Sequence, residues 1–367
     1  MMCLLSNKVI RSLYLLIPAF CLTFFFNSCT RENEEEIIAN NQYQTVPYHI
    51  RVPSGWPEPS IPDFNQTTVE GVRLGRMLFY DPILSSNGLT CSSCHPQDRA
   101  FAVPFRINSR NEVVSIPPIM NLAFNPDWGW KGQDLVLDHL PLTDFSPEFF
   151  NTNMDTLVSR IKKHNLYPLY FREAFGIGDV ANISHSELQH KISYALIQFV
   201  RTVISDNSKF DKVMRREAAF SPEELSGANI FFTEKGDCFH CHGTPLFTNN
   251  TFNNTGLDSI LSGQNLGRYL FTGLNSDKGK FSSPSLRNIE LTAPYMHDSR
   301  FNTLEEVVEF YNSGVRWNSP NIDPVMTKPF KEYGLNLTPS EKSDLISFLK
   351  TLTDTSFLTN PDYANPF

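Results

Sequence analysis

The chain has 367 residues, of which 41% are hydrophobic and 19% are charged. This composition is typical of a globular protein rather than a disordered one, and the length is enough for two domains that each bury a core. The net charge is −8 and no run rich in Lys and Arg occurs, so a nucleic-acid partner is not expected.

The first part of the chain has the pattern of an export signal. Lys8 and Arg11 precede the apolar run LYLLIPAFCLTFFF, and small residues then lead to Cys29 and the polar stretch TRENEEE. We interpret residues 1–28 as a signal peptide of the bacterial lipoprotein type, with Cys29 lipidated as the first mature residue. An ordinary cleaved signal and an uncleaved anchor helix are the alternatives. All three predict export, and beyond residue 26 no apolar run is long enough to span a bilayer.

Helix signals dominate the chain after a polar linker at 29–55, and alternating strand patterns are rare. Apolar residues between Val69 and Phe79 predict a short amphipathic helix, and a second periodic run extends from Leu188 to Val203. Capping sequences predict helix starts at Ser184 with Glu187, Ser221 with Pro222 and Glu224, Thr303 with Glu306, and Thr338 with Pro339 and Glu341. The fold is therefore predicted to be mainly α.

Two five-residue motifs, CSSCH at 91–95 and CFHCH at 238–242, contain four of the seven cysteines. The other three, Cys3, Cys21 and Cys29, lie within the signal or at its end. In an exported protein four cysteines would normally form two disulfides, and a C-x-x-C pair can also be a redox dithiol or half of a zinc site. The histidine that closes each motif argues against all three.

C-x-x-C-H is the covalent attachment signature of c-type haem. Two thiols three positions apart on one helical turn can each form a thioether to the porphyrin, and the next histidine supplies the proximal iron ligand. The motifs predict two haem c groups, and we interpret His240, inside the second motif, as a filler residue rather than a ligand. The predicted attachment residues are Cys91, Cys94 and His95 for the first haem and Cys238, Cys241 and His242 for the second.

The order of helix, haem motif, long loop and further helices occurs twice. It predicts two cytochrome-c-like domains, an N-terminal one over 56–210 and a C-terminal one over 211–367. The Pro- and Asn-rich loops at 96–153 and 243–302 are longer than ordinary connections, so we expect them to wrap the haem edges.

From about residue 56 to residue 355 the chain resembles the bacterial di-haem cytochrome c peroxidases and their MauG-like relatives. The resemblance is carried by LGRMLFYDPILSSNGLTCSSCH, NLAFNPDWGWKG, ALIQFVRTVIS, GANIFFTEKGDCFHCH and SPSLRNIELTAPYMHDSRFNTLEEVVEFY. It implies that the first haem reacts with peroxide and that the second accepts electrons from an external donor. Trp130 matches the family tryptophan between the two haems, and the alternative is a large buried aromatic of the core.

The family acts on peroxide with a glutamine and a glutamate downstream of that tryptophan, and this sequence departs from the pattern. In the segment DLVLDHLPLTDFSPEFF, Glu148 is the best match to the distal acid, and Asp138 stands where the glutamine would be, with His139 beside it. A solvated loop acid is the alternative for both carboxylates. No histidine lies between His95 and Trp130, so we expect a first haem that is open without prior reduction. If that haem is closed, His139 is the candidate for the residue that closes it.

The axial ligand of the second haem also differs from the peroxidase pattern. Where the family's peroxidases place a methionine, fourteen positions after His297, this chain has Tyr311. A tyrosine there resembles the MauG branch, and an anionic oxygen ligand favours ferric over ferrous iron. The alternative is that Tyr311 only packs at a helix end while Met296 or Met326 binds the iron.

Calcium commonly lies between the domains in this family. Thr292 and Pro294 match two of its backbone-carbonyl ligands, whereas Ser115 stands in place of the expected asparagine. A hard cation with oxygen ligands is therefore a candidate cofactor beside the two haems.

The sequence thus predicts a lipid-anchored di-haem peroxidase that reduces hydrogen peroxide to water with electrons from a periplasmic cytochrome or another small redox protein. One alternative is a MauG-like oxidase that modifies a partner protein, which Tyr311 and the missing distal histidine favour. Another is a di-haem electron carrier without turnover, against which Glu148 and its roomy loop argue.

We expect the protein in the periplasm, anchored to the outer membrane by analogy with lipoprotein sorting. Contact with the membrane is expected through the lipid anchor only. Homodimers are usual in the family.

Overall fold

The computed structural model describes residues 43–103, 106–107, 113–125, 129–132, 136–329, 331 and 334–367. The predicted signal at 1–28, the lipidation site Cys29 and most of the polar linker lie outside the described residues. Within the described ranges, no helix is both long enough and apolar enough to cross a membrane.

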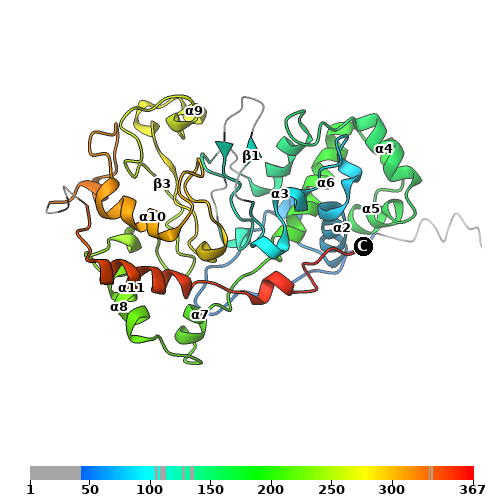
Figure 1. Ribbon diagram of the computed structural model, residues 1–367. Helices are drawn as coiled ribbons and strands as arrows, with labels where there is room; N and C mark the ends of the chain where they lie inside the picture. Colours follow the sequence, from blue (N-terminus) through cyan, green and yellow to red (C-terminus); the bar gives the residue numbers. More distant parts are fainter. Residues whose placement is uncertain are drawn as a thin grey trace, which may run out of the picture. The chain divides into compact units, whose positions relative to one another are not determined.

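The described chain is mainly helical, as the hydrophobic pattern predicts (Figure 1). The α-helices are α2 (Val69–Tyr80), α3 (Cys91–Cys94), α4 (Met154–Lys163), α5 (Tyr167–Phe175), α6 (His185–Val200), α7 (Lys209–Met214), α8 (Pro222–Phe231), α9 (Tyr269–Thr272), α10 (Leu304–Glu309) and α11 (Pro339–Lys350). The strands form two short antiparallel pairs, β1 (Arg106–Ile107) with β2 (Val113–Val114) and β3 (Phe252–Asn253) with β4 (Phe281–Ser282). Each pair lies in the loop region that follows a C-x-x-C-H motif.

Each half of the chain is built on one pair of packed helices. α2 packs against α6 in the first half, and α8 packs against α11 in the second (Figure 1). Both contacts are close because each contains a glycine. A Cβ on Gly75 would lie 1.9 Å from the carbonyl oxygen of Ala195, and a Cβ on Gly227 would lie 2.0 Å from that of Asp344. A side chain at either position would force its helix pair apart.

Two hydrophobic cores surround these helix pairs. The first contains Phe79 of α2 and Phe199 of α6, and the second contains Phe231 of α8 and Phe348 of α11. All four rings are buried, and they meet edge to face or tilted, with centroids 5.3 Å apart in the first pair and 5.1 Å apart in the second. Phe79 and Phe231 each lie four residues after the glycine of their helix, so the two cores repeat one packing arrangement.

Side-chain caps fix the helix starts where the sequence predicts them. Ser221 of α8, Thr303 of α10 and Thr338 of α11 each form a capping box with a glutamate three residues later. Ser184 caps α6 by accepting a hydrogen bond from the amide of Glu187. Each cap satisfies amide groups that the first helical turn leaves without a partner.

Equivalent turns follow the second helix of each pair. Thr202 donates to the carbonyl oxygen of Phe199 at 2.7 Å, and Thr351 donates to that of Phe348 at 2.6 Å. The chain therefore leaves α6 and α11 in the same way, and the predicted periodic run to Val203 ends as helix at Val200.

The end of the chain returns from the second half to the first. Phe357 stacks on Phe101 with ring centroids 6.0 Å apart, and both belong to the first core. Arg76 of α2 donates to the carbonyl oxygens of Pro361 and Ala364. The domain division at residue 210 stays a prediction, although the C-terminal tail packs with the N-terminal half.

Candidate functional site

The first C-x-x-C-H motif occupies a single helical turn. α3 begins after Thr90, whose side chain forms a capping box with Ser93. The spacing of three places Cys91 and Cys94 on the same side of this turn. Nδ1 of His95 donates to the carbonyl oxygen of Phe101 at 2.8 Å. Because a carbonyl oxygen can only accept, the ring proton is on Nδ1, and Nε2 is left to bind a metal.

The second motif repeats this arrangement on a 3₁₀ turn, Cys238–His240. Nδ1 of His242 donates to the carbonyl oxygen of Phe247 at 3.1 Å. Phe101 and Phe247 are both fully buried, and both have a left-handed backbone, with φ of 56° and 55°. This conformation is costly for a phenylalanine and is held by its surroundings. In each half the chain thus turns sharply so that a carbonyl faces the motif's histidine.

No disulfide joins the four cysteines of the motifs. Burial raises the pKa of Cys238 to about 12 and that of Cys241 to about 11, and burial also raises the pKa of Cys91. A redox dithiol needs the opposite, a lowered pKa that favours the thiolate. The two thiols and the imidazole with an open Nε2 instead match the donor set of a c-type haem at both motifs.

A cavity of about 240 Å³ adjoins the second motif. Cys238, Cys241 and His242 line it, and most of the other side chains around it are apolar, including Phe231, Leu304 and Leu345. An apolar cavity with few polar groups beside two thiols and a histidine fits a porphyrin.

Tyr311 lines the same cavity at a break in helix geometry. The helix α10 ends at Glu309 and continues as a π-helical turn, Phe310–Gly314. Such turns are rare and occur frequently at functional sites. Burial raises the pKa of the Tyr311 hydroxyl, which hydrogen-bonds Thr255.

The predicted alternatives to Tyr311 also lie at this cavity. Both Met296 and Met326 line it, so the structure brings all three candidate iron ligands to one place. The thiols of Cys241 and Cys238 are close enough to Tyr311 to contribute to its raised pKa, after burial. The assignment of the ligand to Tyr311 stays a prediction.

Trp130 lines the cavity of the second motif. Its Nε1 donates to the carbonyl oxygen of Ser115 at 3.1 Å, and its ring meets His297 edge to face at 6.4 Å. His297 in turn stacks on Phe281, with ring centroids 3.6 Å apart. Burial lowers the pKa of His297 to about 4, so this ring is neutral at pH 7. The relay role of Trp130 stays a prediction, and its placement beside the second motif agrees with it.

The three residues aligned with the family's calcium ligands come together. Ser115, Thr292 and Pro294 all line the cavity of the second motif, although more than 170 residues separate Ser115 from the other two in sequence. Calcium binding stays a prediction.

The distal acid predicted from sequence, Glu148, is exposed in the turn that follows a long 3₁₀ segment, Leu137–Phe145. Within that segment a second acid, Asp144, is half-buried and lies close enough to Cys91 to raise the pKa of its thiol further, after the larger effect of burial. Sequence reasoning did not single out Asp144, although it lies in the same segment, DLVLDHLPLTDFSPEFF, as Glu148. Asp144 is therefore a further candidate for proton transfer at the first motif, and the role of Glu148 stays a prediction.

Asp138, placed by sequence at the family's glutamine position, lies in a buried ion pair. Its carboxylate contacts Arg201 at 2.5 Å and accepts a hydrogen bond from Asn65 at 2.5 Å, and both charged side chains are inaccessible to solvent. His139 stacks against both Phe64 and Tyr194, with ring centroids 6.1 and 6.5 Å away. The contacts of these two residues are with α6 and the segment before α2, and a catalytic role for Asp138 stays a prediction.

Comparisons with known proteins agree with this geometry. A family model described as di-haem cytochrome c peroxidase matches residues 69–219. The chain is 32% identical over 314 residues to the methylamine utilization protein MauG of Methylorubrum extorquens, covering 83% of each protein. It is 28% identical over 303 residues to the cytochrome c551 peroxidase of Nitrosomonas europaea, covering 80% of this chain and 81% of that protein. The crystal structure of a MauG-like protein associated with microbial copper homeostasis matches with a TM-score of 0.77 and 32% identity, covering 87% of this chain and 99% of that one.

Two C-x-x-C-H motifs on two repeated helical halves define a di-haem protein of the c type. The chain belongs to the family of di-haem cytochrome c peroxidases and MauG proteins. The family is one of oxidoreductases and implies two haem c groups. The relatives of this chain bear two names, peroxidase and MauG.

Proposed function

We propose that this protein is a di-haem peroxidase that reduces hydrogen peroxide to water with electrons from a small redox protein. The observation that carries the proposal is the repeated motif geometry, in which each C-x-x-C-H histidine is fixed through Nδ1 and leaves Nε2 for iron. The first motif also has an acid nearby, Asp144, whose charge acts on Cys91, and the sequence adds Glu148 as the match to the family's distal acid. An electron carrier would not need them.

The first haem is attached through Cys91 and Cys94, with His95 as its proximal ligand, and the second through Cys238 and Cys241, with His242. A haem at the first motif supplies the iron at which the O–O bond of hydrogen peroxide is cleaved; the reaction takes up two protons and two electrons and yields two waters. The carbonyl of Phe101 orients His95 and makes its imidazole a stronger donor.

Asp144 or Glu148 holds the proton that passes between the two peroxide oxygens, a role that needs a carboxyl group within hydrogen-bond reach of the substrate. Trp130 lies beside the second motif and provides an aromatic contact for electron passage between the centres. The ring of His297 meets Trp130 edge to face and is itself stacked on Phe281.

A second candidate function is a MauG-like oxidation of a partner protein. Tyr311 favours it, because this tyrosine lies in the cavity of the second motif on a π-helical turn. A relative named MauG is 32% identical to this chain. Under this alternative the electrons come from a side chain of the partner rather than from a donor cytochrome.

The remaining features of the proposal come from the sequence. We infer an exported, periplasmic protein that is lipidated at Cys29, with calcium as an additional cofactor held near Thr292 and Pro294. A homodimer is part of the proposal by analogy with the family.

A stopped-flow experiment tests the proposal. The oxidised protein with both haems attached is mixed with hydrogen peroxide, with and without a reduced donor cytochrome. Sustained donor oxidation without prior reduction supports the peroxidase with an open first haem. A slowly decaying oxidised spectrum with little donor turnover supports the MauG-like alternative. No reaction with the oxidised protein, followed by turnover after reduction, would indicate a closed first haem, with His139 as the candidate for the residue that closes it. No reaction in either state would leave an electron carrier.

A further inference from the structure

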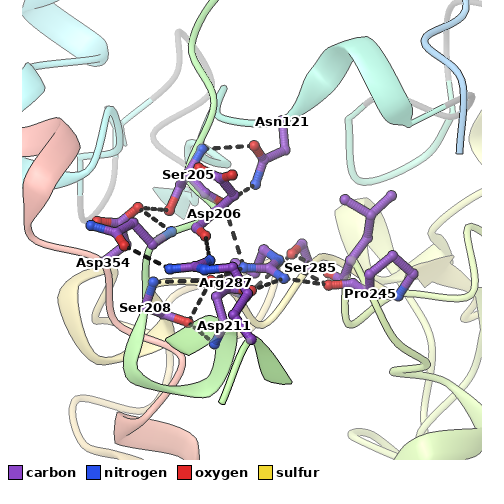
Figure 2. Close-up of polar contacts among 12 residues, drawn as sticks. Asn121, Ser205, Asp206, Ser208, Asp211, Pro245, Ser285, Arg287 and Asp354 are labelled. Atoms are coloured by element: carbon purple, nitrogen blue, oxygen red, sulfur yellow. Dashed lines mark hydrogen bonds and ion pairs between the residues drawn. The ribbon is translucent and has the colours of Figure 1, made fainter. Parts of the chain in front are cut away.

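A buried arginine, Arg287, lies at the centre of a polar network in the second half (Figure 2). Its Nη1 and Nη2 donate to the two carboxylate oxygens of Asp211, each at 2.9 Å. Nε and Nη2 also donate to the carbonyl oxygen of Pro245, at 2.9 and 2.7 Å. The guanidinium covers the ring of Trp56, 4.5 Å from its centroid. The planar guanidinium makes these four hydrogen bonds in a fixed geometry that a lysine could not reproduce.

Arg287 is the last of three consecutive residues that clamp one loop. Ser285 donates through its hydroxyl to the carbonyl oxygen of Leu246 at 2.5 Å. The amide of Leu286 donates to the carbonyl oxygen of Phe247 at 3.2 Å. With Arg287 on Pro245, residues 285–287 thus hold the three successive carbonyl groups of residues 245–247.

The loop held in this way carries a hydrogen-bond acceptor of His242, and the backbone of Pro284 is a second partner of the same ring. The carbonyl oxygen of Phe247 accepts from Nδ1 of His242 at 3.1 Å, in addition to the amide of Leu286. Because Phe247 has a left-handed backbone, its carbonyl direction depends on the contacts that hold the loop. Arg287 and its partner Asp211 therefore act on the proximal histidine only through the 245–247 loop.

The first half differs at the equivalent position. Asn121 and Asn288 correspond in the repeat, since both have a left-handed backbone, with φ of 64° and 60°. The side-chain oxygen of Asn121 accepts a hydrogen bond from the amide of Ser205, and that of Asn288 accepts one from the amide of Asp354. The residue before Asn288 is Arg287, and the residue before Asn121 is the buried Met120. A thioether carries no charge and cannot donate a hydrogen bond, so the first half has no equivalent of the Arg287 guanidinium at this position.

We propose that Arg287 and Asp211 are positioning residues for the second haem centre: by fixing the 245–247 loop, they set the direction of the Phe247 carbonyl and thereby the donor strength of His242. Hydrogen bonding at the outer nitrogen of a ligating imidazole raises its basicity, and stronger donation favours the ferric state. Loosening the loop should therefore raise the midpoint potential of the second haem and leave the first unchanged. The inference rests on the proposed haem attachment at Cys238 and Cys241.

The test uses the full chain with both haems and replaces the whole pair, in R287M/D211N. This variant puts into the second half the residue type found at Met120, and it leaves no uncompensated buried charge. The matched control is R51M/D206N, because Arg51 and Asp206 also form a bidentate ion pair, at 2.6 Å, in the same network, without contacting the 245–247 loop. The conservative variant R287K keeps the charge and loses the fork.

The readouts are mass spectrometry of the haem peptides, the electron paramagnetic resonance spectrum, and a potentiometric titration of each haem. We expect R287M/D211N to bind two haems, to alter the resonance of the second haem only, and to shift its reduction equilibrium by about tenfold toward the ferrous form, a size typical of lost outer-shell contacts. R287K should fall between this variant and the wild type, and R51M/D206N should match the wild type.

Three outcomes would overturn the inference. The first is an unchanged second-haem potential and spectrum in R287M/D211N. The second is an equal shift in the R51M/D206N control, and the third is an equal shift in both haems; either would indicate a general effect on the fold. If the double variant does not assemble, R287K decides by the same readouts. Absence of a haem on the Cys238 peptide of the wild type would instead refute the proposed attachment, and mass spectrometry distinguishes that failure from the others.

Discussion

The hydroxyl of Ser205 donates to the carboxylate of Asp354 at 3.2 Å, and these two residues hold equivalent positions in the two halves of the chain. Each lies three residues after the threonine that closes its helix, Thr202 after α6 and Thr351 after α11. The ends of the two repeated helices therefore meet in one buried polar cluster (Figure 2). The same cluster leads through Arg287 to the loop behind His242.

Removal of the Asp354 carboxylate should destabilise this joint. The carboxylate accepts from the Ser205 hydroxyl, from the amide of Asn207 at 3.0 Å and from Ser356. Asp354→Ala leaves these donors without an acceptor in a buried place, so we expect a loss of about 2 to 3 kcal/mol in the free energy of unfolding. Thermal melts followed by circular dichroism measure it. Asp362→Ala, at an exposed carboxylate, should leave the melting temperature unchanged, and equal melting temperatures for both variants would refute the role of the cluster.

Tyr311→Phe should change the spectrum of the second haem and leave the first as it is. The phenol oxygen is the proposed axial ligand, and the substitution removes that atom while keeping the ring that packs in the cavity. Tyr295→Phe is the matched control, since Tyr295 lines the same cavity but donates to the carbonyl oxygen of Ile289 at 3.0 Å. Ultraviolet-visible and electron paramagnetic resonance spectra of both variants give the answer. A wild-type second haem in Tyr311→Phe would transfer the ligand role to Met296 or Met326.

Asp144→Asn and Glu148→Gln separate the two candidate acids. Loss of a positioned proton donor or acceptor lowers a rate by roughly 10² to 10⁴. The electrostatic effect of Asp144 on Cys91 places it closer to the first haem, so we expect Asp144→Asn to cause the larger loss in kcat/KM for hydrogen peroxide. Steady-state assays with a reduced donor cytochrome measure both. A larger loss in Glu148→Gln would support the assignment made from sequence.

The sequence contained enough information for the helices and for the haem motifs, because those signals are local. A capping box such as Ser221 with Glu224 is complete within four residues, and a C-x-x-C-H motif within five. The pattern also predicts the repeat, since the motif and the helix before it occur twice.

Features that depend on tertiary contacts could not be predicted in this way. The sequence does not indicate that the carboxylate of Asp138 meets Arg201, 63 positions away, inside the first half. Nor does it indicate that the loop after His242 is held by Arg287, 42 residues beyond Pro245. The electrostatic effect of Asp144 on Cys91 has the same origin, because spacing from Trp130 cannot report which acid of the segment lies near the haem motif.

Acid should weaken the fold partly through Asp211. Burial opposes the charge on this carboxylate, but the hydrogen bonds and charge of Arg287, with bonds from Ser208, outweigh it and hold the pKa of Asp211 below its usual 3.8. A depressed pKa means that the pair stabilises the fold above the unfolded-state value and that this stability is lost as the pH falls through the lower folded value. The melting temperature of the wild type should therefore drop steeply below about pH 4, and R287M/D211N should show a shallower drop. R51M/D206N keeps the Asp211 pair and should follow the wild type, so equal slopes in all three proteins would contradict this account.

Gly227→Ala should separate the helices of the second half. A Cβ at this position would lie 2.0 Å from the carbonyl oxygen of Asp344 and 2.8 Å from Cβ of Phe348, so α8 must move away from α11 and open the second core. Overpacking of this kind costs about 1 to 3 kcal/mol, with more expected where backbone is struck. Gly178→Ala is the control, because no atom lies within 4 Å of a Cβ there and its backbone suits any residue. Since the C-x-x-C-H turn at Cys238 follows directly from α8, we also expect Gly227→Ala to lower the yield of protein with the second haem attached. Haem content by mass and melting temperature measure the two effects, and a Gly227→Ala protein as stable and as fully loaded as Gly178→Ala would show that the close helix contact is dispensable.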